Sequence, residues 1–212
     1  HLVGAALALA GSGGTKLPDG ARAGLRHRLV SFAPFAATAA ERAVDLGKPL
    51  LMSLYGRRTK QSGYARLESG RLTRLMLVDA SLGALSKADS AERYAYIRQR
   101  FDESPNVYVA GTDLANAVAK TRTNTFQSEY AWGKAELMDF TSTIGKPLQA
   151  ILYYPADYTP GKKYPMIVYT YERLSDELHS WVAPSERSHY NQTAWTLEGY
   201  SVLMPDIVFT AR

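Results

Sequence analysis

The chain contains no cysteine. It therefore forms no disulfide and no thiolate metal site, and it cannot use a cysteine nucleophile. This absence leaves the compartment open. Our expectation is a periplasmic or secreted location in preference to a cytoplasmic one. The sequence also has no initiator methionine, and its apolar opening, HLVGAALALA, is about half the ~20 residues that a membrane-spanning helix needs. We expect an excerpt from a longer protein, with no membrane partner.

A strong excess of one charge is also missing. The 25 lysines and arginines stand against 20 acidic residues, giving a net charge of +5, and the two signs are interspersed. The one dense basic cluster is Arg57, Arg58 and Lys60, which we interpret as a hairpin tip. We expect no nucleic-acid partner.

The residues that are present predict a globular protein with short antiparallel strands from about 48 to 130. The apolar content of 46% is ordinary for a folded core. KPLLMSLYG has the length of a strand, and SGYARLESGRLTRLMLVD alternates around Glu68, Ser69 and Gly70 as a hairpin does. Residues 36–45 are either a helical turn or a surface loop.

A second hairpin is predicted in AERYAYIRQRFDESPNVYVAG. Tyr94 and Tyr96 mark its first strand, Glu103 to Pro105 its turn, and Val107 to Val109 its second strand. The preceding SKADSAERY is either a short helix or a loop. Strands about every ten residues indicate a sandwich, a barrel or a propeller.

The pattern changes after Tyr130. KAELMDFTSTIGKPLQAILYYPADY predicts two strands around a turn at Ser142 to Gly145, and the apolar run MIVYTY predicts a strand covered on both faces. A helix from about Thr193 to Leu197, a stop at Gly199 and a second buried strand follow. This succession is typical of the start of an α/β sheet.

GKPLQAILYYPADYTPGKKYPMIVYTYERL, followed by LEGYSVLMPDI, resembles the prolyl oligopeptidase family of serine peptidases. The resemblance covers about 129–206 and extends more weakly to about Lys48. It implies a fold of mixed β and α/β class: the last blades of a β-propeller (1–128) followed by the first strands of an α/β-hydrolase domain (129–212). One departure is YTYERLSDELH, which has no glycine where many members carry His-Gly-Gly-Pro.

The implied function is hydrolysis of short peptides through an acyl-enzyme in the intact protein. Such chemistry needs a serine in a GxSxG elbow, then an aspartate and a histidine. No GxSxG occurs in the 212 residues, so we expect the nucleophile, acid and base to lie outside them. An α/β-hydrolase esterase and a non-catalytic propeller-like binding module are the alternatives. The implied partner is a peptide substrate, with no cofactor.

One catalytic contributor is expected inside the chain. In the resembling family a tyrosine hydroxyl at the end of the third hydrolase strand donates a hydrogen bond to the oxyanion. Tyr171 matches that position, and Tyr169 is the second choice if the register differs by two residues. The alternative is that Tyr171 ends a buried strand with its hydroxyl in water.

Other suggestive residues carry less weight. Ser175, Asp176 and His179 lie too close together to form a triad, because the aspartate must stand behind the histidine and the serine in front of it. Asp176, Glu177, His179 and His189 fit no zinc spacing, so we expect no metal. GSGGTK, residues 11–16, lacks the Gly-Lys-Ser/Thr ending of a phosphate loop and is interpreted as a turn.

Overall fold

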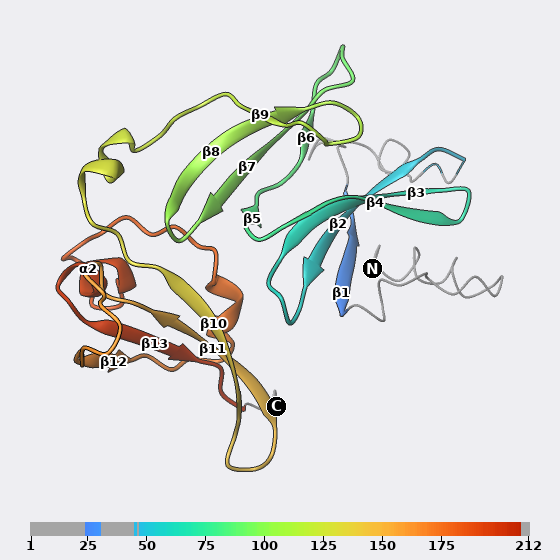
Figure 1. Ribbon diagram of the computed structural model, residues 1–212. Coiled ribbons are helices and arrows are strands. Elements are labelled where there is room, and N and C mark those ends of the chain that lie inside the picture. Colours follow the sequence, from blue (N-terminus) through green and yellow to red (C-terminus); the bar gives the residue numbers. More distant parts are fainter. Residues whose placement is uncertain (1–23, 31–44, 46, 209–212) are drawn as a thin grey trace. The chain divides into compact units, whose positions relative to one another are not determined.

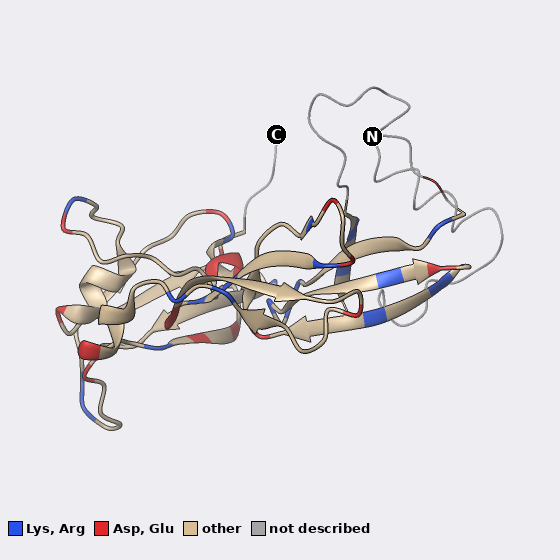
Figure 2. Cartoon of the chain, turned by 90° about the horizontal axis from the view of Figure 1, so that it is seen from above, with Lys and Arg blue, Asp and Glu red and all other residues tan. Residues whose placement is uncertain are grey.

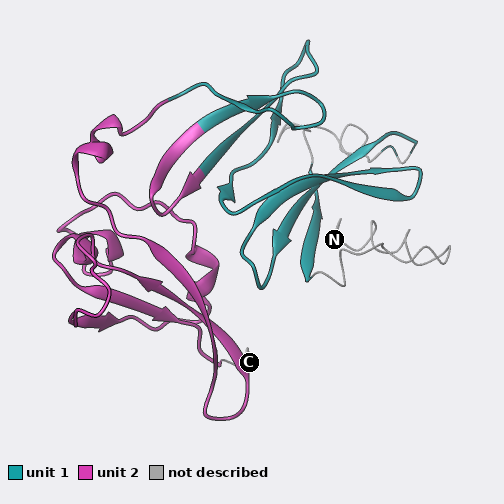
Figure 3. Cartoon of the chain, viewed as in Figure 1, with its two compact units in different colours: residues 1–98, 107–121 teal, residues 99–106, 122–212 magenta. Residues whose placement is uncertain are grey.

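The computed structural model describes residues 24–30, 45 and 47–208 (Figure 1). The chain divides into two compact units, which Figure 3 distinguishes by colour. The first comprises residues 1–98 and 107–121, and the second comprises 99–106 and 122–212. The opening apolar stretch, the predicted turn at 11–16 and residues 36–44 lie outside the described residues.

The first sheet is an antiparallel meander of four strands in the order β1-β2-β3-β4. Its strands are β1 (Leu25–Leu29), β2 (Leu50–Gly56), β3 (Ser62–Glu68) and β4 (Arg71–Val78). The predicted hairpin is confirmed: Ser69 and Gly70 connect β3 to β4 with φ of 48° and 74°. Positive φ at both central residues matches the twist of the paired strands. The basic cluster forms the β2–β3 turn, as predicted.

The second sheet has the order β5-β7-β8-β9, with β6 paired to β7. Its strands are β5 (Ser81–Leu82), β6 (Ser86–Lys87), β7 (Tyr94–Arg100), β8 (Glu103–Ala110) and β9 (Val118–Ala119). The stretch 86–94 therefore holds a short strand and a bend, not a helix. Tyr64 from the first sheet and Tyr94 and Tyr96 from the second share one buried cluster.

The turn of the second hairpin was predicted wrongly. The chain reverses at Phe101 and Asp102, and β8 already begins at Glu103. An apolar residue is an unusual turn former, but the Phe101 ring is 2% exposed and lies 4.7 Å from the Tyr153 ring centroid. Tertiary burial outweighs the turn preference of the sequence around Pro105.

The third sheet, in the second unit, has the order β10-β11-β13-β12. Its strands are β10 (Ala135–Thr141), β11 (Pro147–Tyr153), β12 (Met166–Val168) and β13 (Ser201–Pro205), of which β12 and β13 pair in parallel. The predicted turn between β10 and β11 is confirmed, with Gly145 at a φ of 76°. The same unit holds α2 (Gln192–Leu197) and two 3-10 helices, η1 (Thr125–Glu129) and η2 (Leu174–Glu177).

The predicted helix and its stop are confirmed in α2. Asn191 caps its start, because the Asn191 Oδ1 accepts a hydrogen bond of 2.8 Å from the Ala194 N–H. Gly199 ends it at a φ of 84°, while the Tyr200 N–H donates to the Trp195 carbonyl over 3.0 Å. This is the Schellman arrangement that glycine favours.

Strand β12 departs from its prediction. The strand itself is limited to residues 166–168, and Met166 and Val168 are 50% and 56% exposed. β12 is the edge of its sheet, with β13 on one side and no further strand among the described residues on the other. The exposure of Met166 and Val168, which point to the same face, shows that the apolar run is not covered on both faces. β13, which lies between β11 and β12, is buried as predicted.

The core of the second unit joins residues distant in sequence. Ile151 and Tyr153 of β11 and Val202 and Met204 of β13 pack with Phe101. Burial raises the pKa of the Tyr153 hydroxyl above its ordinary value. Within the part of the chain that the structure describes, no helix is long and apolar enough to cross a membrane.

Candidate functional site

The carboxyl ends of β12 and β13 form the candidate site. Because the two strands run parallel, the residues that follow them emerge at the same edge of the sheet. Tyr171 follows β12, and Asp206 directly follows β13. Ligands of open α/β sheets bind outside the carboxyl ends of parallel strands, so the topology places Tyr171 at the end where binding is expected.

The two candidate tyrosines have different surroundings. The Tyr169 N–H extends the ladder by donating to the Leu203 carbonyl over 3.0 Å, and the Tyr169 ring lies 5.0 Å from the ring centroid of Tyr190. Tyr169 is half-buried against the core. Tyr171 is 61% exposed. Of the two side chains, Tyr171 is the more exposed to solvent.

A buried carboxylate fixes the loop that follows Tyr171. Asp206 is 8% exposed and Ser175 is fully buried. The Ser175 N–H donates to Asp206 Oδ1 over 2.8 Å, and the Ser175 Oγ–H donates to Asp206 Oδ2 over 2.7 Å. Hydrogen bonds to an ionised acceptor are about twice as strong as neutral ones. We call this pair the Ser175–Asp206 clasp.

The residue after Tyr171 is held in an uncommon conformation. Glu172 has a φ of 38°, in the left-handed region that residues other than glycine seldom occupy. Holding such a residue there costs on the order of 1–3 kcal/mol of conformational free energy. Its carbonyl accepts a hydrogen bond of 2.9 Å from the Ile207 N–H. The segment from Asp206 to Ile207 therefore fixes the chain on the C-terminal side of Tyr171 at two points.

The compressed triad does not form. Ser175 Oγ donates to Asp206, and both Ser175 and His179 are buried. Ser175 is thus a structural hydrogen-bond donor. No three acidic or histidine side chains among residues 24–30, 45 and 47–208 gather as metal ligands.

The clasp was not predicted from the sequence. The only local signal was the Pro205-Asp206 pair after a buried strand, which indicates a loop and says nothing of its partner. Ser175 lies 31 residues earlier, where its neighbours Asp176 and His179 suggest a compressed triad and not a partner for Asp206.

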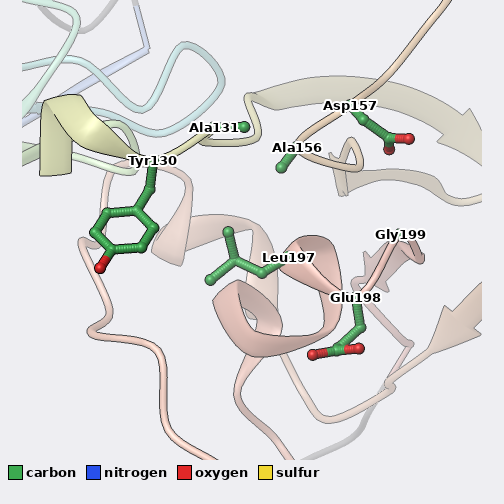
Figure 4. A pocket seen from close by; sticks show the side chains of 7 residues that line it. All are labelled: Tyr130, Ala131, Ala156, Asp157, Leu197, Glu198 and Gly199. Carbon is green, nitrogen blue, oxygen red and sulfur yellow. The ribbon is translucent and has the colours of Figure 1, made fainter.

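A separate pocket of about 480 Å³ lies elsewhere in the second unit (Figure 4). It is lined by Tyr130, Ala131, Ala156, Asp157, Leu197, Glu198 and Gly199. Leu197 to Gly199 precede β13, so the pocket adjoins the opposite end of the parallel pair from Tyr171. Asp157 is engaged by Lys162, whose Nζ lies 3.6 Å from Asp157 Oδ2.

The tyrosines that follow β11 belong to the surface near this pocket. The Tyr154 hydroxyl donates to Glu136 Oε2 over 2.8 Å, and Lys134 Nζ lies 4.3 Å from the Tyr154 ring centroid. The hydrogen bond to Glu136, together with desolvation, raises the pKa of Tyr154 to about 12. These contacts give Tyr154 a structural account. Figure 2 shows lysine and arginine interspersed with aspartate and glutamate along the described chain.

No family model matches the chain, and no curated protein does. Solved structures of peptidases share its fold. A variant of the AtxE2 isopeptidase with Astexin3-dC4 bound matches with a TM-score of 0.60 and 13% identity over 77% of this chain. Porphyromonas gingivalis dipeptidyl peptidase 4 matches with a TM-score of 0.54 and 16% identity over 77% of this chain. A post-proline cleaving enzyme from Rickettsia typhi matches with a TM-score of 0.54 and 14% identity over 87% of this chain. The chain spans about a quarter of their lengths, 24%, 23% and 24% respectively.

Proposed function

We propose that the chain belongs to a serine peptidase of the prolyl oligopeptidase type and spans the junction between a β-propeller (1–128) and an α/β-hydrolase domain (129–212). The meander β1 to β4 is the pattern of one propeller blade. The hairpin β10–β11 followed by the parallel pair β12 and β13 is what the start of a hydrolase sheet requires. The fold shared with peptidases supports the same assignment.

In this proposal Tyr171 donates a hydrogen bond to the oxyanion that forms when a serine attacks the scissile carbonyl. The observation that carries the assignment is an exposed phenol on a turn that the Ser175–Asp206 clasp and the Ile207 N–H hold in place. A donor fixed before the reaction stabilises developing charge without reorganisation. The serine, aspartate and histidine of the triad lie outside these 212 residues in this proposal.

The test compares Tyr171→Phe with Tyr130→Phe in the complete gene product, using a chromogenic peptide amide. Both tyrosines are 61% exposed, which makes Tyr130 a matched control. Loss of one oxyanion donor lowers kcat by about 10²–10³-fold. We expect that loss for Tyr171→Phe with little change in KM, and less than a twofold effect for Tyr130→Phe. Tyr171→Phe with more than half of the parent kcat contradicts the assigned role.

Two further measurements separate the alternatives. A fluorophosphonate probe labels an activated serine, and we expect that serine outside residues 1–212. Absence of both labelling and turnover favours a non-catalytic binding module. Hydrolysis of an ester without hydrolysis of the matching amide favours an esterase.

A further inference from the structure

A second pocket, of about 380 Å³, lies in the first unit. It is bounded by one face of strands β1 to β3 and by residues 82–85, which comprise the last residue of β5 and the link to β6. Pockets of this size hold small organic molecules. It is distinct from the Tyr171 site, which belongs to the second unit.

The strand register brings two arginines to this face. Arg26 pairs with Tyr55 across β1 and β2, and Arg28 pairs with Ser53. Ser53 in turn faces Tyr64 of β3. Residues two apart on a strand point to the same face, and opposite residues on neighbouring strands share it. Both arginine side chains therefore leave the same side of the sheet. Their Cα atoms are about 6.6 Å apart, at about 3.3 Å per residue.

Among the residues that the structure describes, no group occupies the guanidinium donors of Arg26 or Arg28. Both are exposed, and no carboxylate of the described residues lies within ion-pair distance of either. Arg26 Cζ lies 5.0 Å from the Tyr55 ring centroid. Stacking on a ring orients the guanidinium plane, while the N–H groups in that plane stay free to bind an anion.

The opposite wall is apolar and fixed. The Tyr64 hydroxyl donates to the Gly83 carbonyl over 2.8 Å, and Tyr64 itself is 3% exposed. This bond ties residues 82–85 to the sheet. Leu82, Ala84 and Leu85 line the pocket beside Val30, and no acidic side chain is among its described lining residues. Two cationic groups thus face a hydrocarbon wall.

We propose that this pocket binds an organic anion, a carboxylate or phosphate carried on a small apolar body. The arginines form paired N–H···O hydrogen bonds to the acid group, and the apolar body packs against Leu82 and Leu85. The site does not depend on the proposed peptidase activity, because its occupancy is measured without turnover.

The first experiment uses isothermal titration calorimetry at low ionic strength. The complete protein is titrated separately with 3-phenylpropionate, with its neutral amide and with acetate. We expect 3-phenylpropionate to bind at least tenfold more tightly than either of the others. The amide lacks the charge, and acetate lacks the apolar body. Phenyl phosphate is the fourth probe, and its affinity relative to phenylpropionate identifies which acid group the arginines prefer. Equal affinity for 3-phenylpropionate and its amide overturns the proposal. So does the absence of binding by both 3-phenylpropionate and phenyl phosphate.

The second experiment tests the arginines with a matched control. Arg26→Gln/Arg28→Gln is compared with Arg71→Gln/Arg74→Gln, which removes the same charge from exposed positions on β4 outside the pocket. We expect at least a tenfold loss of affinity in the first variant and less than twofold in the second. Equal losses mean that net charge alone attracts the ligand, and they refute the site.

The single variants guard against misfolding. If the double variant loses β1, Arg26→Gln and Arg28→Gln are measured separately, with far-ultraviolet circular dichroism as the check on folding. We expect each to weaken binding at least threefold. Two folded single variants with unchanged affinity contradict the proposal.

Discussion

Asp206 is the residue on which the geometry behind Tyr171 depends. It accepts two hydrogen bonds from the fully buried Ser175. In Asp206→Asn, one carboxylate oxygen becomes an NH₂ group that faces a donor, so one buried donor loses its acceptor. An unsatisfied buried group costs about 1–3 kcal/mol. We expect the free energy of unfolding of the second unit to fall by about 2–3 kcal/mol.

The measurement is urea unfolding followed by tryptophan fluorescence, because Trp132, Trp181 and Trp195 all belong to the second unit. Asp157→Asn is the control. It removes an exposed ion pair with Lys162, which contributes about 0–1 kcal/mol. Equal destabilisation by the two variants would show that the clasp contributes no more than a surface pair.

Tyr64 gives the first unit a pH dependence. Burial, with a smaller contribution from Tyr96, raises the pKa of Tyr64 from 10.0 to about 12. The folded state therefore keeps the phenol proton to higher pH than the unfolded chain. The associated stability is fully present below pH 10 and is lost as the pH rises from about 10 to about 12, amounting to roughly 2 kcal/mol.

Urea unfolding followed by circular dichroism between pH 9 and pH 12 checks this dependence. We expect Tyr64→Phe to be less stable at pH 9, since it lacks the hydrogen bond to the Gly83 carbonyl, and to lose less stability on the way to pH 12. Parallel curves for the parent and the variant would contradict the assigned titration.

At the scale of elements, Asn191 both begins α2 and holds the preceding loop. Its Oδ1 accepts from the Ala194 N–H, and its Nδ2 donates to the Ala183 carbonyl over 2.7 Å. Asn191→Ala removes both bonds, whereas Asn191→Ser keeps a side-chain cap and removes only the second. Loss of a cap costs about 0.5–2 kcal/mol.

We therefore expect Asn191→Ala to lower the unfolding free energy of the second unit by about 2–3 kcal/mol, and Asn191→Ser by about half of that. Tryptophan fluorescence in urea measures both. If the serine variant is as unstable as the alanine variant, the cap at Ala194 contributes nothing.

Elements with local signals were predicted well. The turns at Ser69-Gly70 and at Gly145, and the helix stop at Gly199, follow from backbone conformations that glycine favours. β12 was predicted wrongly because an apolar run carries no sign of whether both faces of a strand are covered. Met166 and Val168 point to the same face of β12, and their exposure depends on whether another element packs on that face.

The candidate site could be predicted only in part. A resemblance in sequence singled out Tyr171, and its assigned role stays a prediction. The Ser175–Asp206 clasp and the hydrogen bond from the Ile207 N–H to the Glu172 carbonyl join segments that are distant in sequence, so no local pattern indicates them. The pocket lined by Arg26 and Arg28 likewise could not be predicted, because it depends on the register between β1, β2 and β3.

At the scale of the whole molecule, the two compact units interleave along the chain. The sequence predicts one boundary, between residues 128 and 129, and this domain boundary stays a prediction. In the structure the end of the β7–β8 hairpin, residues 99–106, groups with the second unit. Phe101 accounts for this, because it packs in the cluster of Tyr153 and Val202.

Phe101→Ala tests that organisation. Replacing a fully buried phenylalanine by alanine costs about 3–5 kcal/mol, and we expect this loss in the unfolding of the second unit, measured by tryptophan fluorescence. Ile97 lies on the same hairpin but belongs to the first unit and is 46% exposed. Ile97→Ala should therefore change the unfolding free energy of the second unit by less than about 1 kcal/mol. A larger effect from Ile97 would contradict the grouping of residues 99–106.

The clasp also sets an order of events during translation. The ribosome adds Ser175 31 residues before Asp206, which at about 5–20 residues per second takes about 2–6 seconds. Throughout that interval the nascent chain lacks Asp206, the carboxylate that holds the turn after Tyr171. The geometry at Tyr171 is therefore completed only after both β12 and β13 have been made.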